Sequence, residues 1–258
     1  IGLWDRYGGS MPSGWTRFVF DQFEFDYEVV YPPELDAGDL NARFDVLVFP
    51  DGAIPAGEGG GGFRGGGMAD AMLERLPEEL RDRVGSVSLD TTVPAIIEFI
   101  ENGGTVVAIG GSSRLGIHAG LPIADYMVDE RGEPYSSEEY YTPGSVHDVA
   151  VQHGSPVTHG LGDRVNILHS HSPVFRVEEG AESVRVLARY DSPNPLVSGW
   201  AWGQEKLDGG ASMLEADIGS GKLFLFGPKI TFRGQSHGTF PLLFNGIYYG
   251  SARRDAVF

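Results

Sequence analysis

Two adjacent serines, Ser112 and Ser113, lie in the one stretch of the chain whose pattern suggests a nucleophile. They follow the apolar, β-branched run Thr105–Ile109 and two glycines, and a helix can begin directly after them. A buried strand, a sharp glycine turn and a helix make up the nucleophile elbow of several hydrolases, where the turn exposes the reactive side chain. The full pattern Gly-x-Ser-x-Gly is absent, because Arg114 and Leu115 stand where the second glycine is needed.

A nucleophilic serine also needs a base, and His118 and His237 are the candidates. With either histidine the chain would be a serine hydrolase. The alternative is that small residues occupy the turn because it is sharp and the next helix packs closely on it. We favour this structural interpretation, since the elbow lacks the rest of its motif.

Polar side chains also follow the other predicted strands. Arg6, Asp51 and Ser112 each come after an apolar run, and Arg233 and His237 lie between the last predicted strand and the last predicted helix. The carboxyl ends of parallel strands meet at one edge of a sheet, so this edge is where we expect a small ligand to bind. The alternative is that Arg233 pairs with an acidic neighbour and only fixes its loop.

His169 and His171 are two residues apart and would share one face of a strand, which suggests a transition-metal site. The sequence defines no third ligand, and solvated or edge-strand histidines are the commoner outcome, so we expect no metal or other cofactor in this chain. The chain has no cysteine, which excludes disulfides, thiolate ligands and a cysteine nucleophile.

The composition is that of an acidic globular protein. Charged residues make up 21% of the 258 residues and hydrophobic ones 41%, and the formal net charge is −17. The negative charge argues against nucleic acid or an anionic membrane surface as a partner. No apolar run reaches the roughly 18 residues of a membrane span. The chain begins at Ile1, inside a strand-like segment, and we expect it to be an excerpt of a longer polypeptide.

Strands and helices alternate around the central turn. Strands are predicted at residues 1–6, 27–31, 44–49, 105–109 and 222–226, and helices at residues 13–23, 77–83 and 92–102 and from residue 239 onward. This order predicts an α/β fold with three layers and a mostly parallel sheet. The apolar residues at helical spacing in the first helix, which we expect to be buried, are Trp15, Phe18, Val19 and Phe23.

The second half of the chain is richer in short strands. Residues 121–197 predict a β-rich insertion after the central strand rather than a second domain, since no linker separates them, so residues 1–258 form one domain. Residues 56–67 are rich in glycine and predict a flexible loop, because they lack the lysine of a phosphate-binding loop. Trp200 and Trp202 would share a strand face, which we expect to be core, with a docking surface as the alternative.

Four segments resemble one protein family. They are residues 5–38, 44–55 (FDVLVFPDGAIP), 85–113 and 198–250. They are similar to the C-terminal region of large bacterial zinc carboxypeptidase-like proteins, in which a metallopeptidase domain is followed by a glutamine-amidotransferase-like domain. The resemblance is weakest across residues 127–164. It implies a flavodoxin-like, class I glutamine-amidotransferase-like fold for this chain and a metallocarboxypeptidase as its parent polypeptide.

The resemblance implies no peptidase chemistry in the chain itself. A zinc carboxypeptidase needs a His-x-x-Glu pair, and none of the seven histidines is followed three residues later by glutamate. An amidotransferase of this fold uses a cysteine at the elbow and a His-x-Glu motif after the last core strand, where this chain has Gly227, Pro228 and Lys229. We therefore expect a non-catalytic accessory domain that packs on a zinc-binding peptidase domain upstream of Ile1 and is exported with it.

Two other functions stay open on the sequence. One is a module that binds a small molecule, a peptide or a glycan at the carboxyl edge of the sheet, and the other is a serine hydrolase. A complete Ser–His–acid geometry would favour the hydrolase, and a roomy polar pocket beside Arg6, Asp51 and Arg233 would favour the binding module. An exposed apolar patch without a pocket would favour the accessory domain.

Overall fold

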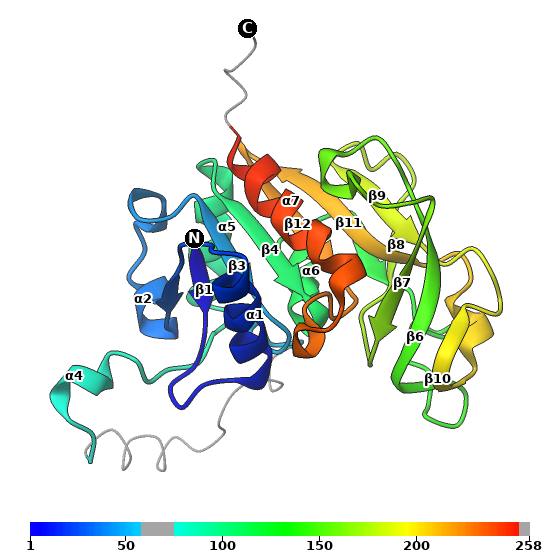
Figure 1. Ribbon diagram of the computed structural model, residues 1–258, viewed down its shortest axis with the longest axis horizontal. Coiled ribbons are helices and arrows are strands. Elements are labelled where there is room, and N and C mark those ends of the chain that lie inside the picture. Colours follow the sequence, from blue (N-terminus) through cyan, green and yellow to red (C-terminus); the bar gives the residue numbers. More distant parts are fainter. Residues whose placement is uncertain (58–74, 253–258) are drawn as a thin grey trace, which may run out of the picture.

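The computed structural model describes residues 1–57 and 75–252 (Figure 1). The glycine-rich loop predicted at residues 56–67 lies, apart from its first two residues, outside the described residues. Helices cover both faces of one large sheet, which gives the three layers of an α/β fold. No helix in the described ranges is long and apolar enough to cross a membrane.

One half of the sheet is parallel. Its strands, in spatial order, are β2 (Glu28–Val30), β1 (Gly2–Trp4), β3 (Val46–Phe49), β4 (Thr105–Ile109) and β12 (Gly221–Phe226). β3 and β4 are apolar runs that are buried along their whole length, as expected for strands covered by helices on both faces. The predicted α/β fold is confirmed, and its parallel strands lie in this half.

Beyond β12 the sheet continues with antiparallel strands, so it is mixed rather than mostly parallel. The next strands in spatial order are β11 (Ala211–Ile218), β9 (Val184–Arg189), β6 (Tyr141–Val151) and β10 (Leu196–Trp202). Three further strands pair with these: β7 (Arg164–His169) with β6, β8 (Phe175–Val177) with β11, and β5 (Ile123–Asp125) with β8. The β-rich insertion therefore extends the same sheet.

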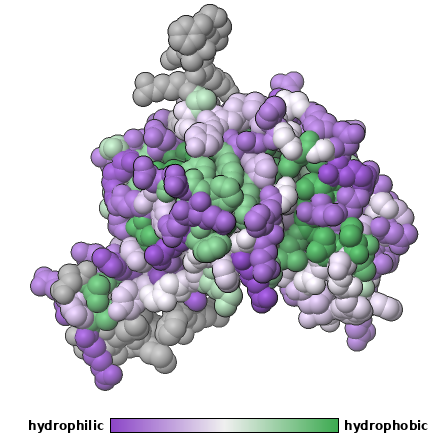
Figure 2. Space-filling view, in the orientation of Figure 1, coloured by the Kyte–Doolittle hydropathy of each residue, from purple (hydrophilic) through white to green (hydrophobic). Residues whose placement is uncertain are grey.

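The helices are divided between two hydrophobic cores, one on each face of the sheet. α1 (Met11–Gln22) and α7 (Phe240–Ser251) cover one face, and α2 (Pro32–Asp36), α5 (Thr92–Glu101) and α6 (Leu115–His118) cover the other. The short α4 (Glu78–Arg81) lies away from both. Figure 2 shows an apolar strip between α1 and α7, where Phe23 and Phe25 lie with ring centroids 4.9 and 5.1 Å from that of Phe244.

The predicted buried stripe of α1 is wrong at Phe18 and Phe23, which are 48% and 43% exposed. The buried face of the helix includes two small hydroxyl residues instead. Ser13 Oγ donates to the carbonyl of Trp4 at 2.8 Å, and Thr16 Oγ1 lies 3.1 Å from Thr231 Oγ1. These bonds bring the helix close to β1 and to the loop before α7, and Val19 and Phe20 complete the buried face.

Candidate functional site

The carboxyl ends of β1, β3, β4 and β12 open on one edge of the sheet, because these four strands run parallel. A loop follows each strand at this edge. The loops bring Asp51, Gly110 and Lys229 together, although Asp51 and Lys229 are far apart in the sequence. Ligand sites of open α/β sheets lie at this edge, so it is the candidate site.

Gly110 occupies the strained position of the elbow. It follows β4 directly, has φ of +62°, and begins the 3₁₀ turn Gly110–Arg114 that leads into α6. Side chains other than glycine rarely adopt this left-handed conformation. In a nucleophile elbow the reactive residue sits on this strained turn between strand and helix. In this chain the position carries no side chain, and the two serines follow it in the turn.

The side chain of Asp51 fills the space in front of Gly110. A Cβ atom built on Gly110 would lie 2.4 Å from Asp51 Oδ1 and 2.8 Å from its Cβ and Cγ atoms. Contacts this short require one of the two groups to move. The place of a nucleophilic side chain is therefore already occupied by a carboxylate.

Both oxygens of this carboxylate are bound. Oδ1 accepts the N–H of Gly111 at 2.7 Å, and Oδ2 lies 2.8 Å from Lys229 Nζ. The N–H after the nucleophile contributes to the oxyanion hole of elbow hydrolases, so Asp51 takes the place of the negative charge that a substrate would develop. The charged side chains of Asp51 and Lys229 are about three-quarters buried, which strengthens their attraction.

Backbone atoms close the space around Gly227. The sequence resemblance aligns Gly227 with the histidine of the amidotransferase motif and Lys229 with its glutamate. A Cβ atom on Gly227 would lie 2.2 Å from the carbonyl oxygen of Pro173 and 2.9 Å from that of Ser212. The N–H of Gly227 also donates to the Ser212 carbonyl at 3.0 Å. Pro173 of the insertion and Ser212 of β11 thus pack directly against the residue that follows β12.

The two serines of the elbow are buried and fully engaged in backbone contacts. Ser112 Oγ donates to Pro50 O at 2.6 Å and accepts the N–H groups of Ala53 and Ile54 at 2.9 and 3.1 Å. Ser113 Oγ donates to the carbonyl of Gly110 at 2.7 Å. This geometry gives Ser112 a structural role, which is to hold the loop after β3 against the elbow.

The candidate bases do not contact these serines. His118 Nε2 lies 2.9 Å from the carbonyl oxygen of Pro55. His237 is exposed and its ring stacks on Phe240, with centroids 5.0 Å apart. No hydrogen bond within the described ranges joins either histidine to Ser112 or Ser113.

The two arginines proposed for ligand binding are exposed and held by their own loops. Arg6 Nε donates to the carbonyl of Gly9 at 3.2 Å. Arg233 has φ of +53°, and its guanidinium lies 5.0 Å from the ring centroid of Phe232. Of the proposed ligand-binding residues, only Asp51 and Ser112 flank the elbow through contacts that the structure shows.

His169 and His171 do not share a strand face, because β7 ends at His169 and His171 has φ of +48°. His169 is buried, and its ring nitrogens lie 2.6 Å from Tyr190 OH and 2.7 Å from Tyr140 OH. His171 is exposed. No group of three or more potential metal ligands exists among the described residues.

A second buried histidine lies beside His169. The ring of His147 stacks on it with centroids 5.2 Å apart, and His147 Nε2 lies 2.8 Å from Ser145 Oγ. Burial lowers the pKa of His147 to about 4 and that of His169 to about 3, and it raises the pKa of Tyr140 to about 12. The cluster is therefore neutral in the folded protein over the physiological range.

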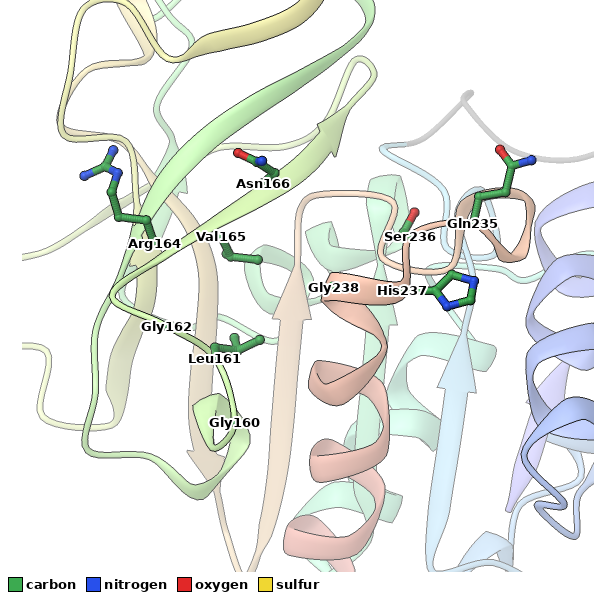
Figure 3. Close-up of a pocket in the computed structure, with 10 residues that line it drawn as sticks. All are labelled: Gly160, Leu161, Gly162, Arg164, Val165, Asn166, Gln235, Ser236, His237 and Gly238. Atoms are coloured by element: carbon green, nitrogen blue, oxygen red, sulfur yellow. The ribbon is translucent and has the colours of Figure 1, made fainter.

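An open pocket of about 500 Å³ lies between the insertion and the start of α7 (Figure 3). The side chains of Leu161 and Val165 point toward it, whereas Arg164 and His237 point away. The remaining lining residues are Gly160, Gly162, Asn166, Gln235, Ser236 and Gly238. The pocket has room for a small ligand but presents no converging charged groups.

The sharp turn predicted directly after the central strand is present as the 3₁₀ turn Gly110–Arg114, and the two serines in it, for which a structural role was favoured, bond backbone groups. The strained conformation of Gly110 could have been predicted from its position directly after the apolar strand, where the turn of an elbow is sharpest. The contact between Asp51 and Lys229 carried no sequence signal, since nothing in the pattern pairs two residues so far apart. The short contacts at Gly227 depend on where Pro173 and Ser212 lie in the folded chain, and no sequence pattern indicates them.

Comparisons with known proteins establish the class of fold. The chain matches no protein-family model and none of the curated proteins. It is similar in structure to a glutamine amidotransferase from Thermotoga maritima, with a TM-score of 0.55 and 10% sequence identity over 98% of this chain and 99% of the other. PurLQS from the same organism gives a TM-score of 0.55 and 16% identity over 96% and 97% of the two chains. At these identities the comparisons show the glutamine amidotransferase-like fold alone.

Replacing Ser112 tests its structural role. Ser112→Ala leaves the buried N–H of Ile54 without its acceptor and leaves the N–H of Ala53 with only its longer bond to Pro50 O at 3.2 Å, so we expect a loss of about 2–3 kcal/mol in the free energy of unfolding. Ser113→Ala removes a single bond, to Gly110 O, and should cost about 1 kcal/mol. Urea denaturation measures both. An equal or smaller cost for Ser112→Ala would contradict the role given to it.

The buried histidines predict a stability that falls in acid. The unfolded chain binds protons at a histidine pKa of about 6.5, whereas folded His147 and His169 do so only at about 4 and about 3. Between these values the unfolded state holds more protons, so stability should fall as the pH is lowered from about 6.5 to 4, by up to about 1.4 kcal/mol per pH unit for each histidine.

Denaturant titrations across this pH range measure the slope. His147→Gln should make the slope shallower, and the matched change at the exposed His159, which contributes to neither pKa shift, should leave it unaltered. If both variants keep the slope of the parent chain, the buried pair is not its source.

Proposed function

We propose that the chain is a non-catalytic interaction domain with a glutamine amidotransferase-like fold. One observation carries the proposal: the side chain of Asp51 occupies the space in front of Gly110 and is held there by the Gly111 N–H and by Lys229. An elbow whose reactive position is a glycine, and whose oxyanion donor binds an internal carboxylate, has neither a nucleophile nor a free site for substrate.

The surroundings of the elbow support the same conclusion. The base position at Gly227 cannot hold a side chain without displacing the backbone at Pro173, and the two serines already bond backbone groups. A covalent mechanism needs a nucleophile and a base within hydrogen-bond reach of each other. This chain shares the fold of its amidotransferase-like neighbours, and we propose that it lacks the covalent catalysis of an amidotransferase.

An exposed aromatic surface supports a role in interaction. Phe18, Phe23 and Tyr248 on α1 and α7 are 48%, 43% and 68% exposed. Phe23 packs against Phe244 and Tyr248 packs against Phe25, with ring centroids 4.9 and 5.6 Å apart. Apolar side chains gathered on one face are typical of surfaces that contact another protein. They are available for a partner domain.

For that partner we propose a zinc-binding peptidase domain upstream in the same polypeptide. The support is the sequence resemblance of residues 5–38, 44–55, 85–113 and 198–250 to the C-terminal region of zinc carboxypeptidase-like proteins. On this proposal residues 1–258 act as one domain, residues 121–197 enlarge its sheet, and the zinc and the peptidase chemistry belong to the upstream domain. Export with the parent protein is part of the same proposal.

A second candidate is a small-molecule-binding module. The observation that favours it is the open pocket beside Leu161, Val165 and Ser236, which lies near the carboxyl edge of the sheet. Its volume of about 500 Å³ falls within the range of small-molecule sites. The apolar lining would suit a ligand with few charges.

Assays of turnover test the non-catalytic proposal. The purified chain should hydrolyse neither glutamine nor a nitrophenyl ester above the rate in buffer, and Lys229→Met and Ser113→Ala should leave that background unchanged. A rate that saturates with substrate and is abolished by either substitution would show that the site is catalytic.

The proposed partner predicts a linked change in stability. A domain that packs on this one only when it is folded raises its apparent stability. The melting temperature of this domain should then be higher in the full-length protein than in the isolated chain, and Phe23→Ser should reduce the difference. An identical melting temperature in both would exclude docking and move the binding module to first place.

A further inference from the structure

Strand β10 is the outermost strand of the antiparallel half of the sheet, and its outer edge pairs with no other described strand. It pairs with β6 alone, and no backbone hydrogen bond between described residues, other than those of the ladder, involves residues 196–202. Its seven residues, LVSGWAW, carry no charge. At the opposite edge β2 has three residues and an ion pair between Glu28 and Arg43 at its start, and prolines follow it. Charges, prolines, short strands and β-bulges normally protect an edge from pairing. β10 has no charge or proline within its length, but its register with β6 shifts between Leu196 and Ser198 and between Trp200 and Trp202, so the stretch from Ser198 to Trp200 is its regular part.

Aromatic rings surround this free edge. Trp200 and Trp202 are 55% and 56% exposed, which corrects the expectation that they lie in the core. The ring of Tyr141 meets that of Trp200 edge to face at 5.9 Å and that of His171 at 5.5 Å. We call Tyr141, His171, Trp200 and Trp202 the β10 shelf. It places exposed aromatic rings next to a strand edge with which no other described strand pairs.

One of the two indole N–H groups of the shelf already has a hydrogen-bond partner. Trp202 Nε1 donates to the carbonyl of Glu138 at 2.6 Å, so its indole is held in place at the end of the strand. Trp200 has no such bond, and its ring is free to be covered by a ligand. A preorganised aromatic surface loses little conformational entropy on binding.

Acidic side chains flank the end of the shelf. Glu138, Glu139 and Glu205 are exposed, and none of them forms an ion pair with a described residue. Hydrogen bonds from Ser136 lower the pKa of Glu139, which keeps it ionised. The nearby cation, Lys206, lies 4.3 Å from the ring centroid of Tyr135. With a chain charge of −17, the local field favours cations.

We infer that the β10 shelf binds an extended basic peptide. The peptide backbone pairs with the free edge of β10 and continues the sheet, a lysine or arginine side chain lies on the face of Trp200, and further basic side chains approach Glu138 and Glu205. A second copy of this chain fits the same edge poorly, because it brings the same negative charge. The inference gives the interaction domain proposed above a second surface, separate from the apolar strip between α1 and α7, and so rests on that proposal.

Peptide binding to the whole chain tests the inference. The probe is a fluorescent peptide that alternates lysine with threonine, and its controls are the same peptide with glutamate in place of lysine and one with N-methylated backbone amides. The lysine peptide should bind one per chain and more weakly as salt increases, and neither control should bind. Fluorescence anisotropy measures all three.

Substitution of the shelf sharpens the test. Trp200→Ala should weaken binding of the lysine peptide about 3- to 30-fold, which is the contribution of one cation–π contact. Tyr248→Ala removes a ring on α7 that is 68% exposed, against 55% for Trp200, and should leave binding unchanged. Circular dichroism checks that both variants keep their fold.

Three results would overturn the inference: equal binding of the lysine and glutamate peptides, binding that survives Trp200→Ala, or self-association of the chain through β10 in sedimentation experiments without peptide binding. Substrate turnover by the chain would instead contradict the proposed function. A chain that neither turns over substrate nor binds the lysine peptide contradicts only the inference about the shelf.

Discussion

The contact of the Asp51 carboxylate with the Gly111 N–H and the Lys229 ammonium ties together the ends of three parallel strands. Asp51 follows β3, Gly111 follows β4 and Lys229 follows β12. A carboxylate that accepts a backbone N–H and pairs with a cation forms hydrogen bonds about twice as strong as neutral ones. The contact stabilises the edge of the sheet where an amidotransferase-like fold otherwise keeps its reactive groups free.

Other features of the edge are consistent with this closed arrangement. Gly110 leaves room for the carboxylate, and Ser112 fixes the loop that carries Asp51. Pro173 of the insertion and Ser212 of β11 contribute from the other side, because their carbonyls lie against Gly227. Added side chains at Gly110 or Gly227 would therefore meet neighbouring atoms at short distances.

Much of the fold could be predicted from sequence, because buried parallel strands and glycine turns leave local patterns. β4 has the predicted bounds, Thr105–Ile109, since an apolar β-branched run between glycines has few alternatives. Periodicity states which residues share a face and not what covers that face, so Trp200 and Trp202 were assigned to the core and are exposed. His171 was predicted to share a strand face with His169, but the strand ends at His169 and His171 has a positive φ. Nothing in a His-Ser-His sequence indicates that turn. The candidate site depends on contacts between distant residues, such as Asp51 with Lys229, and these only the folded chain reveals.

A double-mutant cycle between residues 51 and 110 tests the closed site most directly. The account predicts that Asp51→Gly lowers the free energy of unfolding of the parent chain, because Gly111 and Lys229 lose their partner. In the Gly110→Ala background the same change should be less costly or stabilising, because it removes the contact of 2.4 Å with the new Cβ atom. The backbone strain at φ of +62° is present in both Gly110→Ala chains and cancels in the cycle. Equal costs of Asp51→Gly in the two backgrounds, measured by urea denaturation, would contradict the claim that this carboxylate fills the place of the nucleophile.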